Sequence, residues 1–165
     1  MRPVLRRTSS GIAIGAGERV LATAESTDGV PLAGTRDAFY LGGDPVTRLP
    51  WELVETATWD RDEEVFRIGL VAAWGEEKVV HAVPLAEPGR LLELVRERVT
   101  ASIVLQRHVP VAGRRGVRVI GRRPPRGTGE IAWFFEYDEG VDPDDPDVRE
   151  ASEAALAAAR ADVGL

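Results

Sequence analysis

The sequence predicts an α+β protein in which a bent antiparallel sheet is capped by one long helix and followed by a C-terminal β-β-α extension. Three observations predict this class. Short runs with strand-like alternation recur before residue 86, apolar residues then repeat at helical spacing over residues 87–108, and two more strand-like runs precede a second helical pattern. Runs of strands closed by a helix are typical of antiparallel α+β folds rather than of βαβ units.

Six short segments before residue 86 have the composition of strands and are separated by turn residues. Trp51–Trp59 alternates most regularly, and the charged turn at residues 60–63 predicts a hairpin with Glu64–Val71. The other strands are expected at Glu18–Glu25, Gly34–Leu41, Val46–Leu49 and Lys78–Leu85. Residues 1–17 are expected to form an irregular or short helical lead-in, and the spacing of Gly11, Gly15 and Gly17 matches no phosphate-binding loop.

A single long helix is predicted over Glu87–His108. Its stripe recurs at intervals of three and four residues and consists of Leu91, Leu92, Val95, Val99, Ser102, Ile103 and Gln106. Pro88 suits the first turn of a helix, and Pro110 forbids its continuation. The second half is apolar nearly all round, so it is either buried on several sides or forms an interface. The interface candidates are Val99, Ile103, Val104 and Leu105.

Two more strands are expected at Gly116–Arg122 and Glu130–Asp138, paired as a hairpin. A second helix begins with Asp145 as its N-cap and Pro146 at its first position, and it extends to about Asp162. Its alanine-rich face buries little area, so it needs a partner surface, and the hairpin is the natural one. We therefore expect residues 113–165 to form a β-β-α extension packed on the main domain, with residues 1–165 as a single domain.

The strands "ERVLATAE", "GTRDAFYL" and "LPWELVETATWD", followed by a hairpin, another strand and a long helix, resemble the pleckstrin-homology-like fold. The similarity is to small bacterial members and their GRAM-like relatives, and it covers roughly residues 17–108. It implies a half-barrel closed by the helix. The region after the helix resembles that of uncharacterised actinobacterial proteins of about this length. The loop at residues 26–33 lacks the basic cluster that lipid-binding members use for inositol phosphates.

The composition narrows the classes of function. The chain of 165 residues carries a formal charge of −6 and an ordinary 44% of hydrophobic residues. No apolar run is long enough to span a bilayer, so we expect a soluble, cytoplasmic protein. The absence of cysteine excludes disulfides and thiol chemistry, and two isolated histidines make a metal site improbable. We expect no metal and no cofactor.

Charge is unevenly distributed near the C-terminus. Residues 107–126 hold seven arginines and no acidic residue, whereas residues 127–165 hold eleven acidic residues and two arginines. One hypothesis is a cationic stripe on a hairpin face, beside aromatic residues of the partner strand, that binds nucleic acid or an anionic lipid headgroup. The other is a solvated face matched to the acidic segment 138–147, within the chain or between subunits. The stripe would consist of Arg114, Arg115, Arg118, Arg122, Arg123 and Arg126.

No acid, base and nucleophile converge in the sequence, so we expect no enzymatic activity. The leading interpretation is a binding or scaffold module that contacts a partner protein or associates with itself. Binding of a polyanion through residues 114–126 is the alternative, which the acidic pI near 5.1 disfavours. An unidentified hydrolase or transferase is the third and weakest class.

Overall fold

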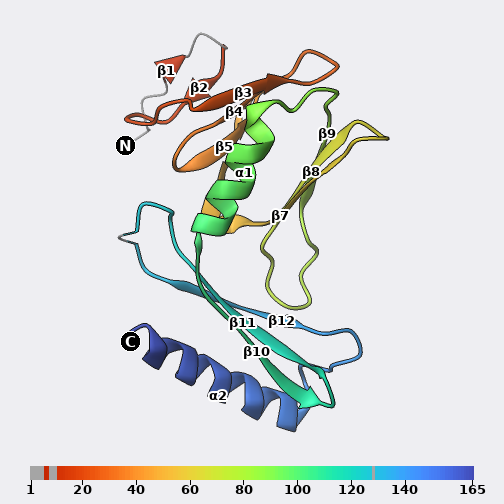
Figure 1. Cartoon of the computed structure of the whole chain (residues 1–165), viewed down its shortest axis with the longest axis vertical. Coiled ribbons are helices and arrows are strands. Elements are labelled where there is room, and N and C mark those ends of the chain that lie inside the picture. The colour runs from red at the N-terminus through yellow and green to blue at the C-terminus, as the bar shows by residue number, and fades with distance from the viewer. Residues whose placement is uncertain (1–5, 8–10, 128) are drawn as a thin grey trace. The chain divides into compact units, whose positions relative to one another are not determined.

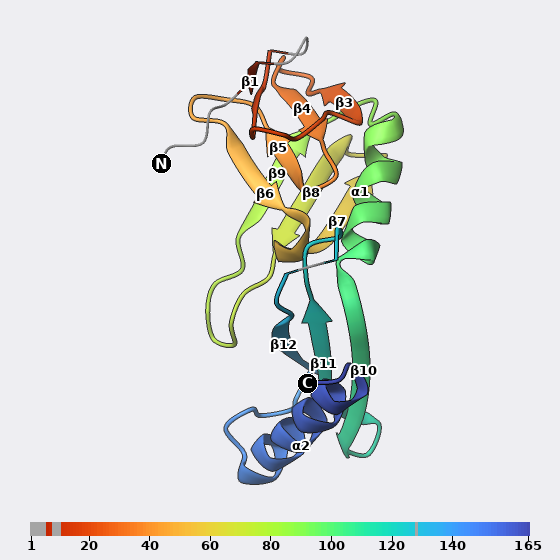
Figure 2. The same ribbon diagram turned by 90° about the vertical axis from the view of Figure 1, so that its left-hand side faces the viewer.

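The computed structural model describes residues 6–7, 11–127 and 129–165, which form two compact units. The first unit comprises the described residues up to 72, residues 77–102 and the short segment 124–127. The second comprises residues 73–76, 103–123 and the described residues from 129 onward. Figure 1 and Figure 2 show each unit as antiparallel strands accompanied by one helix.

The first unit contains two antiparallel sheets with strands in sequence order. The four-stranded sheet has the order β3-β4-β5-β6, and the three-stranded sheet has the order β7-β8-β9. The strands of these sheets are β3 (Ala22–Glu25), β4 (Pro31–Gly34), β5 (Ala38–Leu41), β6 (Thr47–Pro50), β7 (Val54–Asp60), β8 (Val65–Leu70) and β9 (Val80–Pro84). A 3-10 turn, η1 (Trp51–Leu53), joins the two sheets. The predicted class, α+β with antiparallel sheets, is confirmed, and the sheets do not close into a barrel.

The N-terminal lead-in differs from the expectation in one respect. β1 (Arg6–Arg7) and β2 (Ala13–Ile14) pair as two short antiparallel strands. Residues 1–5 and 8–10 lie outside the described residues. Ile12 and Ile14 are buried against Tyr40 and its neighbours, so β2 belongs to the hydrophobic interior of this unit.

The core of the first unit lies where the two sheets meet. Trp51 is fully buried, packs edge-on against Phe39 at 6.2 Å between ring centroids, and donates its indole N–H to the Thr35 carbonyl at 2.9 Å. Helix α1 (Arg90–Ala101) contacts β3 and β4 of one sheet and β7 of the other. Its Leu91 and Val95 are buried in the same cluster. The helix therefore covers apolar surface that both sheets contribute.

The predicted helix over Glu87–His108 is wrong after Ala101. Ser102 is the C-cap of α1. Its backbone N–H donates to the Arg98 carbonyl, and its hydroxyl donates to the Val99 carbonyl at 2.6 Å. The chain then continues as a ten-residue strand, β10 (Ile103–Ala112). Eight positions of β10 pair with β11, and this cross-strand pairing replaces the helical hydrogen bonds that the prediction required.

The second unit has the order β-β-β-α. The predicted β-β-α extension was therefore one strand short, because most of β10 had been predicted as part of the helix. β10, β11 (Arg115–Arg122) and β12 (Ala132–Tyr137) form a three-stranded antiparallel sheet. Helix α2 (Pro146–Asp162) packs on this sheet through Ala155 and Ala159 against Val119. The predicted cap is confirmed, because the Asp145 side chain accepts from the Asp147 N–H. Among the described residues, no helix is long and apolar enough to cross a membrane.

Candidate functional site

The most extensive polar cluster of the first unit surrounds Glu18, which precedes β3. Its side chain is only 6% exposed. Tyr40 of β5 and Arg48 of β6 are direct cross-strand partners, so the sheet register places their side chains together over Glu18. Arg48 donates from a terminal guanidinium nitrogen to Glu18 Oε1 at 2.9 Å, and Tyr40 donates its hydroxyl to Glu18 Oε2. Thr35, which follows β4, donates to Oε1 at 3.2 Å.

These hydrogen bonds determine the ionisation of the cluster. Burial alone would raise the pKa of Glu18, but the hydrogen bonds from Arg48 and Tyr40 outweigh it and hold the pKa below the ordinary value. Burial and the neighbouring carboxylate raise the pKa of Tyr40. The hydrogen bond to Glu18 raises the pKa of Arg48. At neutral pH the cluster is therefore a carboxylate, a neutral phenol and a guanidinium, with no group poised to exchange a proton.

The turn before Glu18 is built around this cluster. The backbone N–H of Gly15 donates to the Tyr40 hydroxyl at 2.9 Å. A Cβ atom at Gly15 would lie 2.4 Å from Glu18 Oε2, so a larger residue would displace the Glu18 carboxylate from its present position. Gly17 has φ of 80°, in the left-handed region that glycine tolerates.

A second ion pair lies beside the cluster. Arg126 reaches Asp37 in the turn between β4 and β5, donating from Nε to Oδ1 at 2.7 Å and from a terminal nitrogen to Oδ2. This fork is the bidentate geometry that arginine forms with carboxylates. The pKa of Arg126 is raised by this hydrogen bond and by the charge of Asp37. Residue 126 lies in the segment that belongs to the first unit.

Two adjoining hollows open next to Asp37 and Arg126. One has a volume of about 200 Å³ and is lined also by Arg19 and Arg36. The other has a volume of about 500 Å³ and is lined by the turn at residues 15–17 and by Arg48. Both Arg19 and Arg36 are exposed, and neither forms an ion pair with any residue that the structure describes. We call Arg19, Arg36 and Arg126 the arginine rim.

The structure does not gather the six predicted arginines on one face. Arg114 and Arg115 are exposed at the β10–β11 hairpin, and Arg118 pairs with Glu136 of β12 at 3.3 Å. Arg122 is 4% exposed and engaged within the protein. Arg123 lines a separate hollow of the second unit together with Trp133. Arg126 belongs to the first unit and joins the rim.

The four interface candidates also occupy different environments. Val99 lies at the end of α1 and packs against the core of the first unit. Leu105 of β10 packs against the core of the second unit, beneath α2. Ile103 and Val104 are half-buried at the start of β10. The segment 99–105 is apolar on every side because its first residue packs in the core of the first unit and its last residue packs in the core of the second.

The two histidines are separated in the structure. His108 Nε2 lies 2.8 Å from Asp138 Oδ2, an oxygen that also accepts the Gly116 N–H at 2.7 Å. These hydrogen bonds, that of His108 first, lower the pKa of Asp138. His81 lies in β9, opposite Ile68. In the described part of the chain, no group of three or more potential ligands could hold a metal ion.

Sequence reasoning missed the Glu18 cluster and, apart from Arg126, the rim. The available signal was the pairing of β5 with β6, which places Tyr40 beside Arg48. Asp37 and Arg126 are 89 residues apart, and no local pattern connects them. No protein-family model and no curated protein matches this chain.

Proposed function

We propose that the chain is a cytoplasmic, non-enzymatic binding module whose first unit has a pleckstrin-homology-like architecture. Four antiparallel strands, three further antiparallel strands and a following helix that contacts both sheets support this assignment. The proposed ligand is an acidic segment of a partner protein, bound at the arginine rim. The first unit thus supplies the frame, and the rim supplies the recognition.

The observation that carries the proposal is the pair of unmatched guanidinium groups on the rim. Arg19 and Arg36 line the same hollow in which Arg126 already holds a carboxylate as a bidentate fork. Guanidinium groups are the usual partners of carboxylates because their paired N–H donors match the two carboxylate oxygens. An acidic side chain that enters this hollow would supply the carboxylate that Arg19 and Arg36 lack.

The buried cluster keeps the Glu18 carboxylate from competing with an incoming carboxylate for the arginines of the rim. Glu18 lines both hollows, but its oxygens are occupied by Arg48, Tyr40 and Thr35. Around the hollows, four guanidinium groups therefore face two carboxylates, both of which are already paired. The local charge is positive in a chain whose total is −6. This contrast favours a short acidic segment over a long polyanion such as a nucleic acid.

The test is fluorescence anisotropy of a labelled Asp/Glu-rich peptide titrated with the full chain. We expect saturable binding that weakens as salt rises, since exposed charges are screened. The double variant R19E/R36E should lose this binding. Arg61, an exposed arginine of the first unit in the β7–β8 turn, provides the control R61E, which should bind like the native chain. Equal binding by R19E/R36E, or binding that does not depend on salt, would remove the rim from the proposal.

Binding of nucleic acid or anionic lipid headgroups is the second candidate, and Arg114 and Arg115 carry it. They are adjacent and exposed, whereas Arg118 and Arg122 of the predicted stripe are paired or buried. We expect R114E/R115E to abolish any retention on single-stranded DNA or on anionic vesicles. Retention that survives both this variant and moderate salt would rule out the hairpin as the binding element.

A further inference from the structure

We infer that the acidic segment recognised by the arginine rim is the connection between β12 and α2 of a second copy of this chain. This inference rests on the proposed function of the rim and names its partner. We call residues 138–147 the acidic connection. It joins the last strand of the second unit to the N-terminus of α2.

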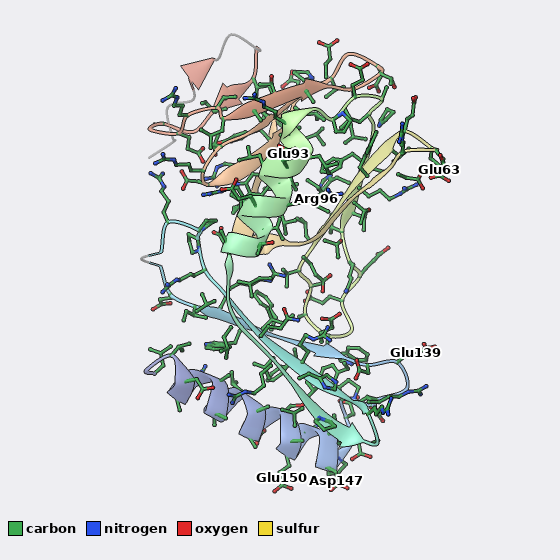
Figure 3. All side chains as sticks on the ribbon, in the orientation of Figure 1. Glu63, Glu93, Arg96, Glu139, Asp147 and Glu150 are labelled. Carbon is green, nitrogen blue, oxygen red and sulfur yellow. The ribbon has the colours of Figure 1, made fainter. Side chains whose placement is uncertain are left out.

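The acidic connection presents an excess of open carboxylates. Its exposed acidic residues are Glu139, Asp142, Asp144, Asp145 and Asp147. The side chain of Asp144 is 84% exposed. In Figure 3 the labelled side chains of Glu139 and Asp147 project away from the ribbon. The connection therefore offers several carboxylates to a partner without any rearrangement of the second unit.

The described part of the chain neutralises few of these carboxylates. Asp144 has one long contact with Arg149, at 3.7 Å. Asp145 accepts the Asp147 N–H as the N-cap of α2, and Asp142 accepts the Asp144 N–H at 2.9 Å. These backbone bonds hold the connection in a defined turn and leave its negative charge uncompensated. The local structure is thus ordered before it binds, which lowers the entropic cost of association.

The two surfaces are complementary in charge and in chemistry. The rim has two guanidinium groups without a carboxylate, and the acidic connection has four exposed carboxylates beyond the one near Arg149. The rim hollow has a volume of about 200 Å³, and one carboxylate of its wall, that of Asp37, is already paired with an arginine. Each copy carries both surfaces, so the acidic connection of one copy can bind the rim of another.

Exposed ion pairs contribute little individually and are screened by salt. The association is therefore expected to be weak, to depend on concentration and to be strongest at low ionic strength. A contact of this kind regulates a binding module directly, because a copy whose rim is occupied by the acidic connection does not bind another acidic segment. Self-association and binding of a foreign acidic peptide are consequently competitive.

Sedimentation velocity of the full chain tests the inference. At low salt we expect the mass to rise with protein concentration, and at high salt we expect a monomer. The variants R19E/R36E and E139K/D144K should each be monomeric at low salt. Asp145 is left intact in the second variant so that the cap of α2 is retained, and circular dichroism confirms that both variants fold.

Mixing provides the decisive arm. R19E/R36E retains the native acidic connection, whereas E139K/D144K retains the native rim. An equimolar mixture should regain part of the associated mass, because the native rim of E139K/D144K can bind the native connection of R19E/R36E. A native chain that is monomeric at every concentration, or association that is unchanged in the variants or not restored by mixing, overturns the inference.

The failure of the inference is distinguishable from the failure of the proposed function. A native chain that stays monomeric but binds the Asp/Glu-rich peptide, and loses it in R19E/R36E, retains the function of the rim and excludes the second copy as its partner. A native chain that neither associates nor binds the peptide overturns both.

Discussion

Replacing Arg48 by methionine tests how the Glu18 cluster is stabilised. The side chain of Arg48 is 42% exposed, but that of Glu18 is only 6% exposed. Methionine retains the apolar part of the side chain and removes the guanidinium, which leaves a buried carboxylate with the Tyr40 and Thr35 hydroxyls alone. Breaking a buried ion pair by removing one partner costs about 3–5 kcal/mol. Because the two hydroxyls remain, we expect the free energy of unfolding to fall by about 3 kcal/mol.

Arg67 supplies a matched control. It is also 42% exposed and lies 2.8 Å from Glu63, compared with 2.9 Å for the pair of Arg48 and Glu18. The carboxylate of Glu63, however, is 61% exposed and can be hydrated when its partner is removed. Exposed pairs contribute about 0–1 kcal/mol, so R67M should leave the free energy of unfolding nearly unchanged. Equal losses in R48M and R67M would refute the reasoning.

The pH dependence separates a charge effect from a packing effect. In the native protein the pKa of Glu18 is lowered from 4.5, so its stabilising contribution is present above that pH and is lost as the pH falls through the folded-state pKa. In R48M burial would instead raise the pKa of Glu18. The cost of burying its charged carboxylate would then be relieved as the pH falls and the carboxylate takes up a proton. The difference between the two proteins should therefore narrow in acid. Urea unfolding followed by tryptophan fluorescence, to which the buried Trp51 contributes, measures this difference in the free energy of unfolding. A difference that widens in acid would contradict the assignment.

Three further outcomes follow from the geometry. In G116A the added Cβ would lie 1.9 Å from the Val109 carbonyl oxygen, so we expect a loss of about 3 kcal/mol that thermal unfolding would detect. L91A removes a fully buried side chain from the core and should cost about 2–5 kcal/mol in urea unfolding. In an NMR titration the pKa of the Asp138 carboxyl should lie below 3.8 and move back towards that value in H108A, and an unchanged pKa would show that His108 does not contribute.

The antiparallel architecture was predictable because local patterns report it. The alternation of residues 51–59 and the charged turn after them predict the pairing of β7 with β8, which the structure contains. The prediction of a helix was wrong at residues 102–108. The apolar residues at the start of this stretch are consecutive, so their spacing matches a helix and a strand equally well. Ile103 and Val104 are β-branched, which favours a strand, and pairing with β11 decided the outcome.

The polar site was predictable only in part. The cross-strand pair of Tyr40 and Arg48 could have been found once the register of their hairpin was known. Glu18 and Arg126 reach the same region from opposite ends of the sequence, and their meeting depends on tertiary structure alone. One hypothesis from the sequence placed the arginine-rich stretch on a single surface. The structure divides it because alternate residues of a strand point to opposite faces and because residue 126 belongs to the other unit.

Mapping the binding of an acidic peptide by NMR tests the central claim most directly. The full chain, labelled with nitrogen-15, would be titrated with the Asp/Glu-rich peptide at low salt, and amide shift changes would be assigned along the sequence. We predict that the largest changes fall at residues 17–19 and 21, at Arg36 and Asp37, and at Arg126, the residues that line the rim hollow. Changes confined to the Arg114–Arg115 hairpin, or no changes at saturating peptide, would contradict the claim that the arginine rim is a binding site for acidic protein segments.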